Sequence, residues 1–298
     1  MPSGDSWSHE VKWDGIRLLA DVGERARLWT RNENDATVAW PELHAAAPDR
    51  DLLVDGEVIA LNDAGLPDFG VLQDRMHVRR ASTAERKAHD LPATFMVFDL
   101  LRLDGRELHG LPLVERRERL QGLVTDGVLA GTWQVPAAYD DGAMLLDATR
   151  EQGLEGVVSK RLSSRYEYGA RSPHWLKFPH RRRASYVIGG WRPETGSTQR
   201  LGALLVGEPT AGGLVYRGRV GSGIAGARGP ELRALLEPLA RPAPPFADEV
   251  PRIDASGTHW VEPVLVVDVE ALGMSTQQRL RQPSYRGLRP DLTPEDLT

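Results

Sequence analysis

The sequence predicts an α+β protein with two domains, a mixed α/β domain followed by a small β-barrel. Its 298 residues exceed the size of most single domains, so two domains are the starting expectation. Candidate strands and helices are interleaved in the first half, whereas short β-rich runs dominate after the basic stretch 180–183. We therefore expect a first domain over residues 1–181 and a second over residues 182–298.

The first half combines strand and helix signals. Apolar runs bounded by turn residues predict strands at 16–22, 27–30, 51–54, 57–61 and 93–101. The first two runs flank a turn at Gly23-Glu24, which predicts a β-hairpin, and the two central runs are separated by Asp55-Gly56. Helical spacing of apolar residues predicts helices at 115–124 and 142–152.

The second half is dominated by short strands. Apolar runs predict strands at 186–191, 201–206, 214–220 and 261–269, with a helix at 229–239 and a proline-rich loop at 241–251. Several short strands with one helix are typical of the OB-fold, a small β-barrel. An SH3-like barrel would show much the same pattern, so both remain open at this point.

Composition and charge exclude several classes of protein. The chain has no cysteine, which excludes disulfides, thiolate metal sites and cysteine nucleophiles. Its apolar runs are too short to span a bilayer, and the N-terminus lacks the pattern of a signal peptide, so we expect a cytoplasmic protein without a membrane partner. The net charge of −5 argues against a generic nucleic-acid binder, although arginine clusters at 181–183, 217–219 and 279–289 allow a basic face.

The strongest single motif for chemistry is Glu10-Val11-Lys12-Trp13-Asp14-Gly15-Ile16-Arg17. A lysine attacks a phosphoanhydride only as the free amine, so its surroundings must favour the neutral form. Gly15 would let the backbone approach a nucleotide closely, and Arg17 could aim its guanidinium at phosphate or ribose oxygens. Alone, such a short motif is weak evidence, because it also occurs in ordinary surface turns.

Further motifs follow this lysine in a fixed order. They are 31–35 with 40–43, 55–57, 69–75, 98–105, 155–160, 175–177 and 281–289. In this order and spacing the chain resembles the ATP-dependent DNA ligases, and most of all the bacterial ligase domains of the end-joining ligase D and ligase C groups. The resemblance covers nearly the whole chain and singles out Lys12 as the position of the catalytic nucleophile.

The resemblance implies the fold and the reaction. It implies a mixed α/β nucleotidyltransferase domain of ATP-grasp-like type, followed by an OB-fold domain. Lys12 would take AMP from ATP as a covalent lysyl–AMP and release pyrophosphate. The AMP would pass to the 5′-phosphate of a nick in duplex DNA, and the 3′-hydroxyl would then displace it. Each step is phosphoryl transfer, which depends on positioning and charge neutralisation.

The resemblance also implies roles for individual residues. The nucleotide-binding set is Glu10, Arg17, Arg31, Glu57, Phe98, Lys160 and Lys177. Within it, Phe98 would stack on adenine, Glu10 would bind its amino group, Glu57 would contact the ribose, and Lys160 and Lys177 would face the phosphates. Glu57 and Glu155 would bind Mg²⁺ or Mn²⁺. The C-terminal motif contributes Arg281, Arg286, Arg289 and Asp291. Taken singly, Phe98 would be assigned to the core and the two glutamates to turns.

The chain departs from the ligase pattern at two positions. Pro179 and Leu292 stand where the family has lysines expected to face ATP phosphates. Either the first step is slow, or a neighbouring arginine such as Arg181 or Arg182 replaces the missing charge. The short segment before Glu10 suggests a minimal ligase without an extra N-terminal DNA-binding domain.

Two alternatives to a DNA ligase follow from these features. One is an RNA ligase or a capping guanylyltransferase, which share the lysine motif and the carboxylates. The other is a DNA-end-binding module that keeps the fold but adenylates poorly. For the ligase, the expected partners are nicked or broken duplex DNA, the Ku protein and an end-joining polymerase or nuclease. We expect a monomer associated with the nucleoid.

Overall fold

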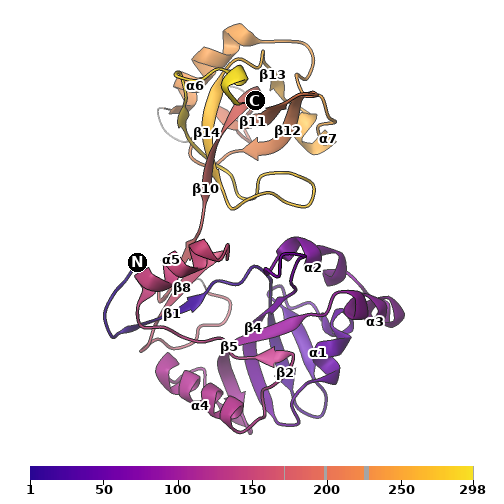
Figure 1. Ribbon diagram of the computed structural model, residues 1–298, viewed down its shortest axis with the longest axis vertical. Helices are drawn as coiled ribbons and strands as arrows, with labels where there is room; N and C mark the ends of the chain where they lie inside the picture. The colour runs from indigo at the N-terminus through magenta and orange to yellow at the C-terminus, as the bar shows by residue number, and fades with distance from the viewer. Residues whose placement is uncertain (171, 198–199, 225–227, 298) are drawn as a thin grey trace. The chain divides into compact units, whose positions relative to one another are not determined.

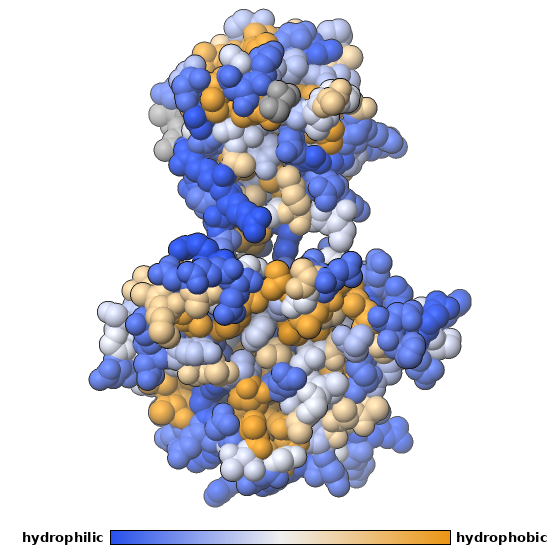
Figure 2. Space-filling view, in the orientation of Figure 1, coloured by the Kyte–Doolittle hydropathy of each residue, from blue (hydrophilic) through white to orange (hydrophobic). Residues whose placement is uncertain are grey.

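The computed structural model describes residues 1–170, 172–197, 200–224 and 228–297. The chain divides into two compact units, Met1–His180 and Arg181–Thr298 (Figure 1). In each unit sheets and helices enclose an apolar core, and on the face drawn in Figure 2 hydrophilic side chains predominate. None of the helices in the described ranges is both long and apolar enough to cross a membrane.

The larger sheet of the first unit has the order β3-β2-β4-β5-β6, with β7 paired to β5. The bounds are β2 Ile16–Val22, β3 Arg27–Thr30, β4 Leu52–Ile59, β5 Thr94–Leu103, β6 Arg106–Glu107 and β7 Trp133–Gln134. β2 and β3 pair antiparallel over the residues expected from sequence, which confirms the predicted hairpin. Alternating burial along β2 explains this success, because every second side chain enters the core.

The two strands predicted at 51–54 and 57–61 are one strand, β4, so the predicted break at Asp55-Gly56 is wrong. Asp55 lies fully buried because Arg17 and Tyr166 satisfy its carboxylate. Residue 56 must be glycine within this strand, because a side chain there would collide with the ring of Phe95 on β5. Residues typical of turns are therefore held in a central strand by partners distant in sequence.

Helices flank the sheets of the first unit. They are η1 Thr37–Ala39, α1 Pro41–Ala45, α2 Phe69–Met76, α3 Ala81–Asp90, α4 Leu113–Thr125 and α5 Gly142–Glu151. The predicted helices at 115–124 and 142–152 correspond to α4 and α5 and are confirmed. α5 begins after Asp141, whose carboxylate accepts a hydrogen bond from the backbone N–H of Met144, a common N-cap arrangement.

A second, three-stranded sheet in the same unit carries the lysine motif. It consists of β1 Trp7–Val11, β8 Gly156–Arg161 and β9 Trp175–Pro179, in the order β1-β8-β9 with antiparallel pairs. Pro179 ends β9, an edge strand, which is where a residue without an N–H is tolerated in a sheet. The second sheet thus brings the segment before Lys12 beside the segment that follows Glu155.

The second unit contains one six-stranded sheet, ordered β12-β11-β10-β14-β15, with β13 on β10. Its strands are β10 Arg182–Pro193, β11 Leu201–Thr210, β12 Gly213–Val220, β13 His259–Trp260, β14 Val266–Ala271 and β15 Ser284–Leu288. A bridge between Ser222, just after β12, and Ser284 on β15 joins the two edges, so the sheet curls. This is the OB-fold barrel predicted from sequence.

Two details of the second unit differ from the sequence prediction. The strand expected at 261–269 begins only at Val266, and a further strand, β15, follows within the C-terminal arginine motif. The helix expected at 229–239 is α6 Arg228–Leu236 followed by the 3-10 turn η2 Glu237–Leu239. Pro238, inside this turn, cannot continue an α-helix. Two short elements, α7 Arg252–Ala255 and η3 Pro294–Leu297, complete the unit.

Candidate active site

Lys12 lies directly after β1, at the point where the two sheets of the first unit meet. Its backbone N–H donates to the carbonyl oxygen of Gly156 at 2.8 Å, which extends the β1–β8 ladder by one residue. Its ammonium forms an ion pair with the carboxylate of Glu155. Both side chains remain partly exposed, 20% and 12% respectively, so a ligand can reach the amine. The predicted nucleophile and a predicted metal ligand are therefore in contact.

The structure explains why residue 15 is a glycine. A Cβ atom at this position would collide with the carbonyl oxygen of Val58 and lie 2.9 Å from the side chain of Glu57. The loop carrying Lys12 therefore packs directly on β4, where only glycine fits. We expected the glycine to admit a nucleotide; the close approach found in the structure is to the sheet.

Glu57 and Lys177 complete the group of charges around Lys12. Burial raises the pKa of Glu57 to about 8. The nearby carboxylates of Asp55 and Glu155 also raise this pKa, whereas the positive charges of Lys12 and Arg17 oppose the shift. Lys177 projects from β9, and burial together with the charges of Lys12 and Arg17 lowers its pKa. Both shifts favour the neutral form, which shows that this site holds charge at an energetic cost.

Arg17 is held by a buried carboxylate. Its guanidinium donates to both oxygens of Asp55, at 3.0 and 2.5 Å, and reaches the hydroxyl of Tyr166 at 3.3 Å. Tyr166 in turn donates to Asp55 at 2.7 Å, and burial raises the pKa of its hydroxyl. The Arg17 side chain is 40% exposed, so it is fixed in direction but accessible. Sequence reasoning missed Tyr166, because no motif position singles it out.

Glu10, Phe98 and Lys160 form a second, more deeply buried group. Lys160 donates to Glu10 at 2.7 Å, and its ammonium lies 4.3 Å from the ring centre of Phe98 and 4.5 Å from that of Trp175. The two rings meet edge to face at 5.8 Å, and burial lowers the pKa of Lys160. We expected Lys160 to face phosphates, but the structure places it against a carboxylate and two aromatic rings. Trp175 of β9 is therefore also part of this group.

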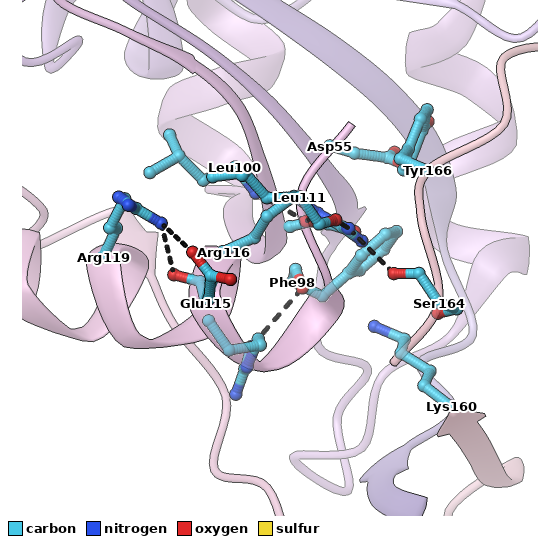
Figure 3. A network of polar contacts seen from close by, with 12 residues as sticks. Asp55, Phe98, Leu100, Leu111, Glu115, Arg116, Arg119, Lys160, Ser164 and Tyr166 are labelled. Carbon is cyan, nitrogen blue, oxygen red and sulfur yellow. Dashed lines mark hydrogen bonds and ion pairs between the residues drawn. The ribbon is translucent and has the colours of Figure 1, made fainter. Parts of the chain in front are cut away.

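A polar network supports the strand that carries Phe98 (Figure 3). Arg116 of α4 donates to both oxygens of Asp99 at 2.8 Å and to the carbonyl oxygen of Ser164 at 3.0 Å. Asp99 and Arg116 are completely buried, so the pair ties β5, α4 and the segment after β8 together. The sequence did not predict the contacts of Arg116 with Asp99 and Ser164, since these residues do not belong to one motif.

Other predicted residues are not members of these two groups. Arg31 lies exposed in the turn after β3, and none of the contacts described above involves it. The C-terminal set belongs to the second unit, where Arg286 pairs with Glu270 at 2.9 Å and Arg289 pairs with Asp291 at 2.7 Å and Asp268 at 3.3 Å. Arg286 and Arg289 therefore form ion pairs on and beside β14.

The carboxylates near Lys12 fit a metal ion that arrives with a nucleotide. Within residues 1–170, 172–197, 200–224 and 228–297, no group of three or more His, Cys, Asp or Glu side chains could hold a metal. Magnesium, however, usually takes only one or two carboxylates and completes its shell with water and substrate phosphates. Glu57 and Glu155 match that smaller requirement. They lie close together, because the charge of Glu155 contributes to the raised pKa of Glu57.

A nucleotidyltransferase-type domain with a lysine among carboxylates, followed by an OB-fold, defines a covalent nucleotidyltransferase. The family model for the ATP dependent DNA ligase domain matches residues 2–178, and that for the ATP dependent DNA ligase C terminal region matches residues 197–292. The chain belongs to the ATP-dependent DNA ligases.

Individual relatives agree with this family. The multifunctional non-homologous end joining DNA repair protein LigD of Mycobacterium tuberculosis is 38% identical over 296 residues, which cover 98% of this chain and 37% of that protein. A probable DNA ligase of Anaeromyxobacter dehalogenans is 34% identical over 96% of this chain and 56% of its own length. The crystal structure of the M. tuberculosis LigD ligase domain matches with a TM-score of 0.53 over 98% of this chain and 92% of that one. The chain thus spans less than two thirds of the two full-length relatives.

Proposed function

We propose that this protein is a DNA ligase that uses ATP to seal nicks or ends in duplex DNA, with Lys12 as the covalent nucleophile. The observation that carries the proposal is the position of Lys12, which is accessible, fixed through its backbone to Gly156 and paired with Glu155. Membership of the ligase family supports ATP as the nucleotide.

The chemistry follows from one amine acting on one phosphoanhydride. The neutral amine of Lys12 attacks the α-phosphorus of ATP, an N–P bond forms, and the bond to the leaving pyrophosphate breaks. The oxygen of a DNA 5′-phosphate then attacks the same phosphorus and releases Lys12. Finally the 3′-hydroxyl attacks the activated 5′-phosphate and AMP departs. The carboxylate of Glu155 forms an ion pair with the Lys12 ammonium, so it can accept the proton of this ammonium before the first attack.

The surrounding residues position the nucleotide. In the proposal, Arg17 and Lys177 neutralise phosphate or ribose oxygens, Phe98 stacks on the base and Glu10 binds its amino group. Glu57 and Glu155 would hold Mg²⁺ or Mn²⁺, which when bound spreads the negative charge of the phosphates. Arg31, Arg281, Arg286, Arg289 and Asp291 remain proposed contacts of nucleotide or DNA.

The second unit, residues 182–298 in the proposed division, would hold the DNA duplex. Exposed arginines such as Arg183 and Arg286 suit phosphate contacts, whose strength falls with salt. The LigD relatives are named as non-homologous end joining proteins, so Ku and an end-joining polymerase or nuclease are proposed partners. We propose that the protein works as a monomer on DNA in the nucleoid.

Intact-protein mass spectrometry after incubation with ATP and Mg²⁺ tests the proposal. The wild type should gain the mass of one AMP, and Lys12→Ala should gain none. Lys87→Ala is the matched control, because Lys87 lies on α3 outside the site and its loss should leave the adduct intact. The same samples should seal a nicked duplex only when Lys12 is present.

Absence of an adduct in wild type overturns the proposal once pyrophosphate treatment has shown that Lys12 was not already adenylated. Tight binding of nicked DNA in that case would support the non-catalytic DNA-end-binding module. A GMP adduct in preference to AMP, or sealing of RNA alone, would support the capping or RNA-ligase alternative.

A further inference from the structure

One oxygen of a buried carboxylate in the first unit has no hydrogen-bond partner. Glu10 is 3% exposed, and its Oε1 atom is buried without a hydrogen bond, while Oε2 accepts from Lys160 at 2.7 Å. Arg117 forms an ion pair with the same oxygen, but its Nη1 atom lies 3.8 Å away, which is too far for a hydrogen bond. An unsatisfied buried acceptor typically costs about 1–3 kcal/mol, so a ligand that donates a proton to this oxygen binds favourably.

Two aromatic rings lie beside the ammonium that pairs with Glu10. Phe98 and Trp175 meet edge to face, and the Lys160 ammonium lies over both rings. Figure 3 shows Lys160 extending toward Phe98. A flat heterocycle with an N–H group suits these two rings, because the ring stacks while the N–H reaches the carboxylate. A base bound here could be recognised through a hydrogen bond to Oε1 of Glu10.

Lys160 fixes that direction. A carboxylate paired with an ammonium accepts hydrogen bonds and donates none, and the bond to Oε2 leaves Oε1 as the free acceptor. Adenine places an amino donor on its six-membered ring, whereas guanine places a keto acceptor at the same position. An acceptor opposite Oε1 leaves both oxygens unpaired, which is a strong basis for rejecting a ligand.

We propose that Lys160 is a positioning residue that makes the site select adenine over guanine nucleotides, by holding Glu10 as an oriented, acceptor-only carboxylate. This inference rests on the proposed function, in which Lys12 is adenylated. It assigns Lys160 to base recognition rather than to the phosphates. The opposing view is that the Glu10–Lys160 pair only stabilises the fold, and that view predicts equal losses with both nucleotides.

The test measures lysyl–nucleotide formation at limiting ATP and at limiting GTP, and compares the ratio of the two rate constants. Lys160→Met should lower the ATP-to-GTP ratio by at least about tenfold, since Glu10 then loses the hydrogen bond that orients its carboxylate. The matched control is Lys177→Met on the neighbouring strand β9, which should slow both reactions and leave the ratio unchanged. An unchanged ratio in Lys160→Met overturns the inference.

Glu10→Gln gives an independent test with an isosteric change, so the result does not depend on whether Lys160→Met folds. Lys160 would bind the amide oxygen of the new side chain, and its NH₂ group would take the place of Oε1. The site would then donate to guanine, so the ratio should fall further than in Lys160→Met. In the double variant the amide is free to turn, so the two effects should not add.

The outcomes separate this inference from the proposed function. If neither nucleotide modifies Lys12 in wild type, the proposed function itself fails. If wild type forms the AMP adduct but Glu10→Gln and Lys160→Met both keep the wild-type ratio, only the role of Lys160 is wrong.

Discussion

Two groups of charged residues, one in each unit, are held in opposite ways. In the first unit, burial raises the pKa of Glu57 and lowers the pKa values of Lys160 and Lys177. In the second unit, a hydrogen bond from Arg286 lowers the pKa of Glu270, and one from Arg289 lowers the pKa of Asp291 to about 2. The first set is pushed toward neutrality and the second is held in the ionised form.

This contrast teaches what each unit can do. Desolvated groups with shifted pKa values suit chemistry, because small changes in their surroundings move protons. Exposed arginine–carboxylate pairs contribute little to stability and exchange readily for phosphate oxygens. The difference therefore predicts large effects of substitution in the first unit and small ones in the second.

The largest effect is expected from breaking the buried pair beneath the site. Arg116→Met leaves Asp99 buried and unpaired, and such changes typically cost about 3–5 kcal/mol. Urea unfolding should show this loss, and Arg119→Met on the exposed face of the same helix is the control with little change. Equal stabilities of the two variants would contradict the network drawn in Figure 3.

The next effect concerns pH. Because the pKa of Glu57 is raised from 4.5 to about 8 in the folded state, its stabilising contribution is complete below 4.5 and is lost as pH rises through 8. Glu57→Gln lacks this titration and should become more stable than wild type as pH rises, by up to about 3 kcal/mol near neutrality. Unfolding in EDTA at several pH values measures it. Glu115→Gln, an exposed change, should show no such trend.

A smaller effect is expected from restoring a missing charge. Leu292→Lys places an ammonium where the resemblance to the ligase pattern predicts a lysine, and it should speed formation of the AMP adduct by about tenfold through phosphate neutralisation. Sealing of a nick that already carries AMP should not change. A faster second step with an unchanged first step would show that this position serves DNA rather than ATP.

The smallest structural effect is expected in the exposed pairs of the second unit. Arg286→Gln should leave the unfolding midpoint unchanged, because its pair with Glu270 is exposed. Affinity for nicked DNA should nevertheless fall, with a salt slope smaller by about one. Glu262→Gln, which removes an exposed partner of Arg241, serves as the control with unchanged DNA affinity. Equal affinities of wild type and Arg286→Gln at every salt concentration would remove Arg286 from the DNA contacts.

Local patterns were enough to predict much of the fold. The hairpin of β2 and β3 follows from alternating burial and a turn between adjacent strands. The continuity of β4 could not be predicted, because Asp55 is tolerated there only through Arg17 and Tyr166. β15 was also missed, since Ser284–Leu288 contains few apolar residues and is defined by pairing with β14.

The candidate site shows the same limit. The ordered motifs singled out Lys12, Glu57 and Glu155, and the structure brings these three together. The bond between Glu10 and Lys160 joins residues 150 positions apart, and no spacing rule predicts it. Motifs therefore identified the groups that we propose to react, whereas their supporting contacts required the fold.

The pairing of β1 with β8 has a consequence for synthesis of the protein. The ribosome releases Lys12 early, but the strand that completes its surroundings, Gly156–Arg161, follows only when most of the first unit has been made. Such long-range pairing forms late in folding. A nascent or truncated chain ending before β8 would expose Lys12 without its backbone partner Gly156, and we expect such a chain to form no AMP adduct.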